Sequence, residues 1–320
     1  MSRSSPIIDE NSWILPEGIK KIPQLGITYS KTIINLWINY FEQYPDASPE
    51  LEQKADQLAL QGFPREIRKL AYLKISKAED TIINTIPLSS SLSTDQINAF
   101  KKQIHNDVER TYKNCLWMHD PNNRLRIENL LVRYIMVDEG LEYTQGMNFF
   151  AAIFTQVLDD CEAFWTMYNL FNDYKHNQSF VMHADMTGLL HHLDVHKRFL
   201  KKRLPKISNV LEQFKVEPIL YAPVWFLSGG LGNQMPSSMI YLIMDRYVYF
   251  GQRSTHSLLL AMMKTQEALI LNASSSQEIF QAINSIGLLF FKINLKNFIE
   301  CWNELMISQD EYEDEVGDDF

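Results

Sequence analysis

Segments with apolar residues at helical spacing follow one another along most of this chain, and none shows the alternation of a strand. Glycine and proline number only 12 each among 320 residues, so the turn signals that many short strands need are scarce. We therefore expect an all-α fold, a compact multi-helix array without internal repeats. The clearest helical segments are residues 32–41, 126–137, 149–158, 162–173, 189–204, 237–250, 258–271, 277–290 and 295–306, and a further helix is expected to begin at about residue 96.

Composition divides the chain into three parts. Residues 1–55 mix short apolar patches with prolines, among them those at 16, 23, 45 and 49, and we expect a partly helical N-terminal extension. Residues 56–305 form the main domain. Residues 306–320 are expected to be an acidic disordered tail, because the last eleven residues hold seven acids and no base. Most of the net charge of −9 lies in this tail, so the nearly neutral body does not indicate a nucleic-acid binder.

The cysteines and the apolar runs indicate a soluble intracellular protein. Cys115, Cys161 and Cys301 are odd in number, lie far apart and form no C-x-x-C pair, which disfavours disulfides and a zinc cluster. The first residues lack the apolar core of a signal peptide. No apolar run approaches the length of a membrane span, and we expect no transmembrane segment.

Two clusters of side chains suggest functional sites, but ordinary structural roles explain both clusters better. His191, His192 and His196 invite a metal hypothesis, but the glutamate of H-E-x-x-H and a third ligand are missing, so surface or half-buried histidines are favoured. Residues 197–206 carry six basic side chains, which are either a solvated helix face or a surface for an anionic membrane or acidic partner. We favour the solvated face.

Two short stretches carry the chemistry. Ile104, Asp107 and Arg110 are spaced three apart, so they share a helical face and Asp107 can hold Arg110. A polar cluster, residues 143–146 (YTQG), directly precedes an apolar helix. Taken alone, the first would be a surface ion pair and the second a helix cap.

Together these stretches resemble the TBC domain, the catalytic module of Rab GTPase-activating proteins. That family carries I-x-x-D-x-x-R and Y-x-Q-G, and both motifs are complete here. The resemblance extends through residues 62–73, 192–226 and 236–251, and covers roughly residues 60–270. The residues of the two motifs are Ile104, Asp107, Arg110, Tyr143, Gln145 and Gly146.

This sequence departs from the family pattern in several places. The third motif usually reads Arg-Ile-Trp-Asp, whereas residues 242–245 are Leu-Ile-Met-Asp, so that Asp245 persists. Tyr72 stands where tryptophan is usual, and Glu142 replaces a glycine. One residue is inserted between positions 225 and 236. These changes concern local packing and the choice of GTPase, and they leave Arg110 and Gln145 in place.

The resemblance implies a multi-helix fold of the TBC type and a mechanism that uses two residues supplied in trans. Arg110 would stabilise charge on the transferred phosphate, and Gln145 would orient the attacking water. Gly146 would let the backbone approach the partner's nucleotide, while Tyr143 and Asn148 would buttress the loop. Asp107, Ile104 and Asp245 would support this site.

The resemblance also implies the partner. It would be a Rab-family small GTPase in its GTP-bound state, which binds the GTP and Mg²⁺ itself, so that this chain needs no cofactor and no metal. Such a protein would be cytoplasmic, and peripheral association with endomembranes stays open. The alternative is a non-catalytic TBC module that binds a small GTPase or other trafficking proteins. An independent hydrolase has no nucleophile–base pair to support it.

Overall fold

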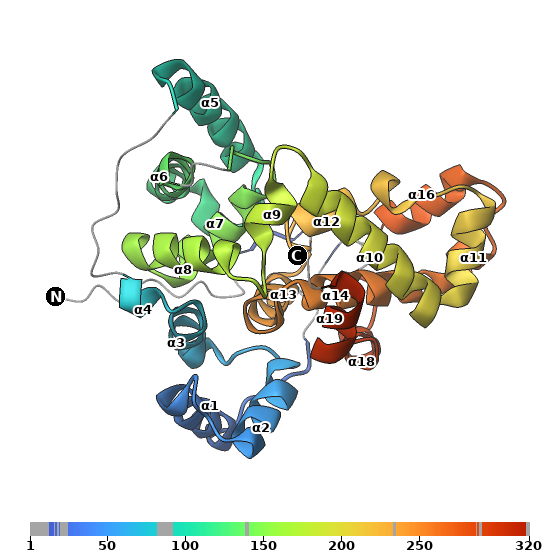
Figure 1. The fold of residues 1–320 in the computed structure, drawn as a ribbon, viewed down its shortest axis with the longest axis horizontal. Coiled ribbons are helices and arrows are strands. Elements are labelled where there is room, and N and C mark those ends of the chain that lie inside the picture. The colour runs from blue at the N-terminus through green and yellow to red at the C-terminus, as the bar shows by residue number, and fades with distance from the viewer. Residues whose placement is uncertain are drawn as a thin grey trace.

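A computed structural model describes residues 13–15, 17, 19, 25–81, 92–137, 141–232, 235–285, 287 and 290–317. Within these residues the regular structure is helical and contains no β-strand, and one isolated antiparallel bridge joins Trp13 to Cys115. The all-α prediction is confirmed (Figure 1).

The helices are short and follow one another closely. In chain order they are α1 Lys31–Gln43, α2 Pro49–Ala59, α3 Arg65–Ser76, α4 Ala78–Thr81, α5 Thr94–Arg110, η2 Leu116–His119, α6 Pro121–Val137, α7 Met147–Val157, α8 Asp160–Asn172, α9 Gln178–Met182, α10 Thr187–Arg203, α11 Pro205–Gln213, η3 Pro218–Leu220, α12 Pro223–Leu227, α13 Ser237–Phe250, α14 Gln252–Thr265, α15 Glu267–Leu271, α16 Ser276–Asn284, α18 Leu295–Glu304 and α19 Gln309–Val316.

Local signals set the helix boundaries. Ser93 caps α5, and the Gln96 side chain reaches back to the Ser93 amide, which completes a capping box. The helix predicted over residues 258–271 is divided in the structure into α14 and α15. α14 begins six residues earlier, directly after Gly251, whose φ of 66° ends α13.

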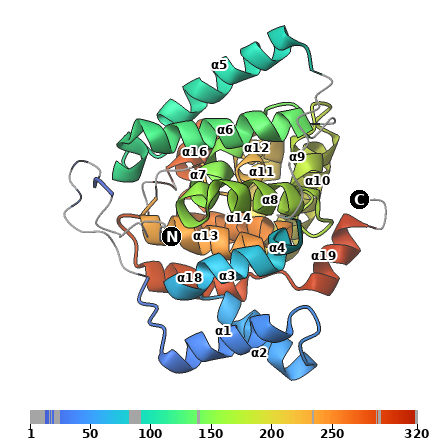
Figure 2. The same ribbon diagram turned by 90° about the vertical axis from the view of Figure 1, so that its left-hand side faces the viewer.

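The helices α13 and α14 form the centre of the molecule. Nearly every side chain of both is buried, which agrees with the apolar sequence of α13 and with the apolar second half of α14. Figure 2 shows the layers around them: α5 and α6 lie on one side, and α3, α18, α1 and α2 lie on the other. This arrangement places α5 at an outer edge of the molecule, where its exposed face is accessible to a partner.

The N-terminal helices complete the core. Trp37 of α1 is fully buried, and its ring packs edge-on against Phe63 at 4.9 Å and against Tyr249 at 6.0 Å. The boundary that we expected at residue 55 falls inside α2. Helices α1 and α2 therefore contribute to the fold, as expected of a helical extension that buries aromatic side chains.

The prediction of a disordered tail over residues 306–320 is wrong for its central part. Residues 309–316 form α19, which is capped by Ser308 and buries Tyr312. Glu311 and Glu315 form ion pairs with three cations of α10: Arg198, Lys202 and Arg203. The acidic composition indicated disorder, but a basic helix face elsewhere in the chain provides the complement.

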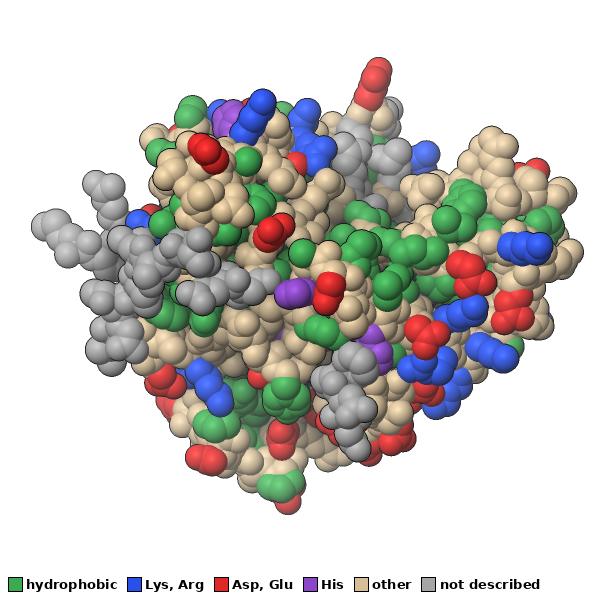
Figure 3. Space-filling model, turned by 45° about the horizontal axis from the view of Figure 1, so that its top comes forward, with side chains coloured by type: hydrophobic (Ala, Val, Ile, Leu, Met, Phe, Trp, Pro, Cys, Tyr) green, Lys and Arg blue, Asp and Glu red, His purple; other side chains and the backbone are tan. Residues whose placement is uncertain are grey.

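These contacts also show what the basic residues of positions 197–206 do, which we expected to form a solvated helix face. Three of its cations face the acids of α19, and Lys197 pairs with Glu217. Figure 3 shows basic and acidic side chains interspersed on the side of the molecule where α10 and α11 lie. The described residues therefore offer no continuous basic surface on this face.

The histidines of α10 are more deeply buried than the sequence indicated. His192 and His196 are almost inaccessible, and His192 Nδ1 lies 3.1 Å from His256 Nε2 of α14. Burial lowers the pKa of His192 and of His196 to about 3. Within the part of the chain that is described, no group of three or more ligand-type side chains fits a metal ion.

Candidate functional site

The site begins at the C-terminal end of α5. Ile104 is fully buried and Asp107 is nearly so, because both lie on the face that packs against the body. Arg110 is the last residue of the helix and leaves 53% of its side chain exposed. Its Nη2 lies 2.6 Å from Asp107 Oδ1. A buried carboxylate thus holds an exposed guanidinium, which differs from an ordinary pair of surface charges.

Tyr143 supports the same carboxylate from the other side. Its hydroxyl donates to Asp107 Oδ2 over 2.8 Å. Burial, together with the nearby charge of Asp107, raises the pKa of Tyr143, so the phenol remains a protonated donor. With both oxygens of Asp107 engaged, the direction in which Arg110 leaves α5 is determined by buried partners.

A second set of hydrogen bonds joins the loop before α7 to α5. The Gly146 amide donates to Asn148 Oδ1 at 3.0 Å, and Asn148 Nδ2 donates to Thr111 Oγ1 at 2.7 Å. The Thr111 hydroxyl donates in turn to the Asp107 carbonyl at 2.7 Å. Asn148 and Thr111 are both buried, so the loop and the end of α5 are held as one unit.

Gly146 has a steric role inside the protein. Its φ is 127°, and a Cβ built on it would lie 2.1 Å from the Leu227 carbonyl oxygen. Any other residue would therefore displace the backbone of α12. We expected this glycine to allow approach to a partner's nucleotide; the contact that requires it in the structure is with Leu227.

Arg110 and Gln145 face a common surface depression. Gln145 is exposed, as expected for a residue that acts on a partner. Both residues line a hollow of about 370 Å³, which we call the α5 hollow; it is lined by Ala99, Lys102, Gln103, Asn106, Asp107, Arg110 and Gln145. The hollow thus brings together two side chains that lie 35 positions apart in the chain.

Asp245 belongs to a different network. Its carboxylate accepts hydrogen bonds from Arg68 Nε at 2.8 Å, from the Tyr72 hydroxyl at 2.8 Å and from the Phe63 amide at 2.9 Å. These partners join α13 to α3 and to the segment before α3. We expected Asp245 to support the site, and the structure places it where it ties two helices of the core together.

The departures from the family pattern lie mainly in the core. Leu242 and Met244 are buried in α13, and neither lines the α5 hollow. Tyr72 donates to Asp245, and Glu142 is exposed. The sequence did not single out Thr111 or Arg68; a threonine beside the end of a helix and an arginine in a mixed segment carry no signal of their own.

A search against family models matches residues 66–271 to the Rab-GTPase-TBC domain. Among curated proteins, the chain is 26% identical over 267 residues to TBC1 domain family member 2B of Xenopus tropicalis, covering 80% of this chain and 28% of that protein. It is 23% identical over 246 residues to Rab GTPase-activating protein tbc-11 of Caenorhabditis elegans, covering 72% and 25%. The chain thus spans about a quarter of the length of these two relatives.

Solved structures share the fold at low identity. The flagellar RabGAP TBC domain of Chlamydomonas superposes with a TM-score of 0.65 at 18% identity, covering 86% of this chain and 91% of that one. The Ypt/Rab-GAP domain of Gyp1p gives 0.63 at 12% identity, covering 85% and 98%. No helix in the described part of the chain is long and apolar enough to cross a membrane.

Proposed function

The chain belongs to the Rab-GTPase-TBC domain family, and we propose that it accelerates GTP hydrolysis by a Rab-type small GTPase in its GTP-bound state. One observation carries the proposal: Arg110 and Gln145 line the same hollow, and joined networks of buried hydrogen bonds hold Arg110 and the loop that carries Gln145. The name of the relative tbc-11, a Rab GTPase-activating protein, agrees with this activity.

Arg110 acts as the arginine finger in this proposal. Hydrolysis of GTP requires little covalent chemistry from protein, but charge that develops on the phosphates must be stabilised. A guanidinium offers five donors in a planar fork, which matches two phosphate oxygens at once. Asp107 and Tyr143 orient Arg110 before the partner arrives, which reduces the entropy lost when the finger engages.

Gln145 acts as the glutamine finger. Its amide can accept a hydrogen bond from the attacking water and donate one to a phosphate oxygen. The network from Gly146 through Asn148 to Thr111 holds its loop against α5. Fingers of this kind contribute roughly 10³ to 10⁵ in rate, or about 4 to 7 kcal/mol. The partner supplies the GTP and Mg²⁺, and this chain supplies neither cofactor nor metal ligand.

The direct test is a panel of purified Rabs loaded with GTP, each assayed for phosphate release with and without this protein. We expect acceleration of at least one Rab. A protein that binds a GTP-loaded Rab without accelerating hydrolysis of any member would be the non-catalytic module instead. A cytoplasmic location with peripheral association to the partner's endomembrane belongs to the same proposal.

A sharper test decides whether Gln145 or the Rab's own glutamine positions the attacking water. In a Rab whose own glutamine is changed to leucine, hydrolysis should still be accelerated, and Gln145→Ala should abolish that acceleration. Gln103→Ala is the matched control, because Gln103 lines the same hollow from α5. If the leucine mutant is not accelerated while Gln145→Ala retains full activity on the wild-type Rab, the Rab positions its own water and our role for Gln145 is wrong.

A further inference from the structure

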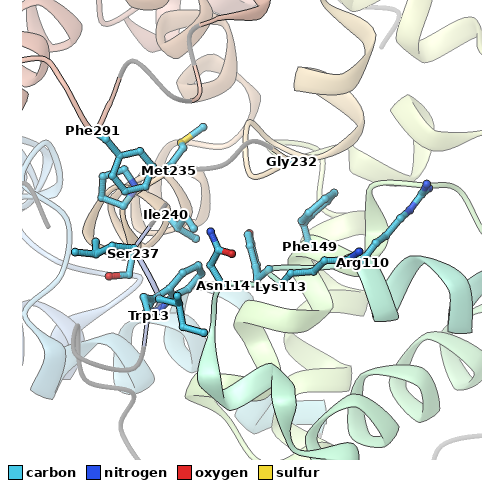
Figure 4. A pocket seen from close by; sticks show the side chains of 14 residues that line it. Trp13, Arg110, Lys113, Asn114, Phe149, Gly232, Met235, Ser237, Ile240 and Phe291 are labelled. Carbon is cyan, nitrogen blue, oxygen red and sulfur yellow. The ribbon is translucent and has the colours of Figure 1, made fainter. Parts of the chain in front are cut away.

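A second cavity lies on the other side of the end of α5. It measures about 150 Å³ and we call it the Trp13 cavity. Its apolar wall comes from distant parts of the chain: Trp13, Ile14 and Leu15, Tyr112, Phe149, Met235, Pro236, Ile240 and Phe291. Figure 4 shows Trp13, Met235 and Ile240 gathered around one space, while the guanidinium of Arg110 is turned away from it. A cavity of this size accommodates about one aromatic ring.

The wall of this cavity is a built part of the fold. The Ile14 amide donates to the Asn114 carbonyl at 2.6 Å, beside the bridge from Trp13 to Cys115. The Trp13 ring lies edge-on against Tyr112 at 5.4 Å, and Tyr112 lies in the same way against Phe149. These aromatic faces form a rigid slot for a planar apolar group.

The polar part of the cavity favours an anion. Lys113 and Arg110 are the charged residues of the lining and both are cationic; the Arg110 guanidinium is turned away from the cavity, so the available charge is that of Lys113. The first turn of α13 opens onto the cavity through Pro236 and Ser237, and a helix N-terminus attracts negative charge. Within the described residues, Lys113 forms no ion pair.

A buried hydroxyl supplies the independent evidence for a ligand. Ser237 is 2% exposed, and its Oγ has no hydrogen-bond partner among the described residues. The buried Trp13 Nε1 is also unpaired. Leaving buried donors unpaired costs free energy, so two such groups in the lining of one cavity indicate that something polar binds there.

We propose that the Trp13 cavity binds a small aromatic carboxylate. The ring occupies the slot between Trp13, Phe149 and Ile240. The carboxylate accepts from the Ser237 hydroxyl at the start of α13, and Lys113 contributes charge at the rim. Arg110 lines both this cavity and the α5 hollow, but its guanidinium is turned away from the Trp13 cavity (Figure 4), and the proposal does not depend on any activity toward a GTPase.

Phenylacetate is the probe, and saturation-transfer NMR measures its binding. We expect a Kd of about 1 mM, typical of a ligand of this size. The neutral 2-phenylethanol and the cationic phenethylammonium should bind at least about ten times more weakly, because both lack the charge that Ser237 and Lys113 recognise. Saturating phenylacetate should also raise the melting temperature of the protein.

Three variants locate the site. Ser237→Ala and Lys113→Ala should each raise the Kd about 3-fold to 10-fold, and Ile240→Trp should fill the slot and abolish binding. Lys101→Ala is the matched control, since Lys101 is exposed on α5 and does not line the cavity. Thermal melting checks that each variant folds, and the conservative Ser237→Ala keeps the test decisive should Ile240→Trp fail to fold.

The proposal is overturned by any of three results. The first is a titration that does not saturate by about 20 mM phenylacetate, roughly twenty times the expected Kd. The second is equal binding of the three probes. The third is an unchanged Kd for phenylacetate in a folded Ser237→Ala variant.

Discussion

Two buried aspartates in this molecule hold the same kinds of partner with opposite results. Asp107 is bonded to Arg110 and Tyr143, and Asp245 is bonded to Arg68 and Tyr72. The arginine side chain is 53% exposed in the first network and 16% exposed in the second. The first network presents a cation to solvent, whereas the second encloses one.

The surroundings of the carboxylates explain this difference. Asp107 lines the α5 hollow, so water can hydrogen-bond to its carboxylate when a substitution removes the Arg110 or Tyr143 side chain. Asp245 also accepts from the Phe63 amide, and Arg68 stacks over the Tyr241 ring at 4.7 Å, so that little of this network is open to solvent. The same three residue types thus present a cation at the surface where solvent is near, and tie helices of the core together where solvent is excluded.

The largest expected effect concerns activity. Arg110→Ala should reduce the acceleration of GTP hydrolysis by about 10³-fold or more, while the free energy of unfolding changes by about 1 kcal/mol or less, because water replaces the lost partner of Asp107. Arg110→Lys should fail as well, since lysine lacks the planar fork. Single-turnover phosphate release and denaturant unfolding measure the two quantities. Full activity in Arg110→Ala would exclude the finger role.

The second effect is the reverse of the first. Arg68→Ala should lower the free energy of unfolding by about 3 to 5 kcal/mol, because the Asp245 carboxylate is left buried without its countercharge. At a temperature where the variant is still folded, its acceleration of hydrolysis should match that of the wild type. A loss of less than about 1 kcal/mol would show that burial does not separate the two networks.

A third group of buried polar residues, His192, His196 and His256, has no acidic partner among the described residues, and its contribution to stability should respond to acid. Burial lowers the pKa of His192 and of His196 to about 3, and burial beside both rings lowers the pKa of His256 well below its usual value. These histidines are neutral in the folded state and bind protons near pH 6.5 when unfolded. Their contribution to stability is therefore present above about pH 6.5 and is lost as the pH falls.

At pH 5 the loss should be roughly 2 kcal/mol for each of His192 and His196 relative to pH 7.5. Denaturant unfolding at the two values measures it. His196→Leu should show a smaller difference between the two values, and His119→Gln is the control, since His119 is exposed. Equal stability of the wild type at both values would show that the cluster already binds protons in the folded state.

The sequence predicted the local parts of these networks and missed the long-range parts. The spacing of Ile104, Asp107 and Arg110 predicted that they share one face of α5, because helical geometry alone determines which residues share a face. The bonds from Asn148 to Thr111 and from Arg68 to Asp245 join residues 37 and 177 positions apart. No local pattern encodes such pairs, so the sequence did not indicate that Asp245 binds Arg68.

The prediction of a disordered C-terminal tail was wrong for a related reason. Composition reports that residues 310–320 are acidic, but it does not report that α10 presents Arg198, Lys202 and Arg203 at matching positions. The buried Tyr312 was the residue to notice, since an aromatic side chain among charges can anchor a short helix. Helices with a strong apolar period were predicted well because burial and periodicity agree in them.

The smallest expected effect tests the role of solvent directly. Tyr143→Phe removes the bond to Asp107 Oδ2, and Tyr72→Phe removes the bond to Asp245 Oδ1; both phenols are buried and each bond is 2.8 Å long. If water from the α5 hollow replaces the Tyr143 hydroxyl, Tyr143→Phe should cost about 1 kcal/mol, and Tyr72→Phe should cost about 2 to 3 kcal/mol because Asp245 has no such replacement. Tyr143→Phe should also reduce the acceleration of hydrolysis by a few-fold, roughly the effect of a less well oriented finger, and Tyr72→Phe should not. Denaturant unfolding and phosphate release on the two variants decide the matter. Equal costs would mean that Asp107 is as closed to water as Asp245, and the exposure of Arg110 would then have to arise from its place at the end of α5 alone.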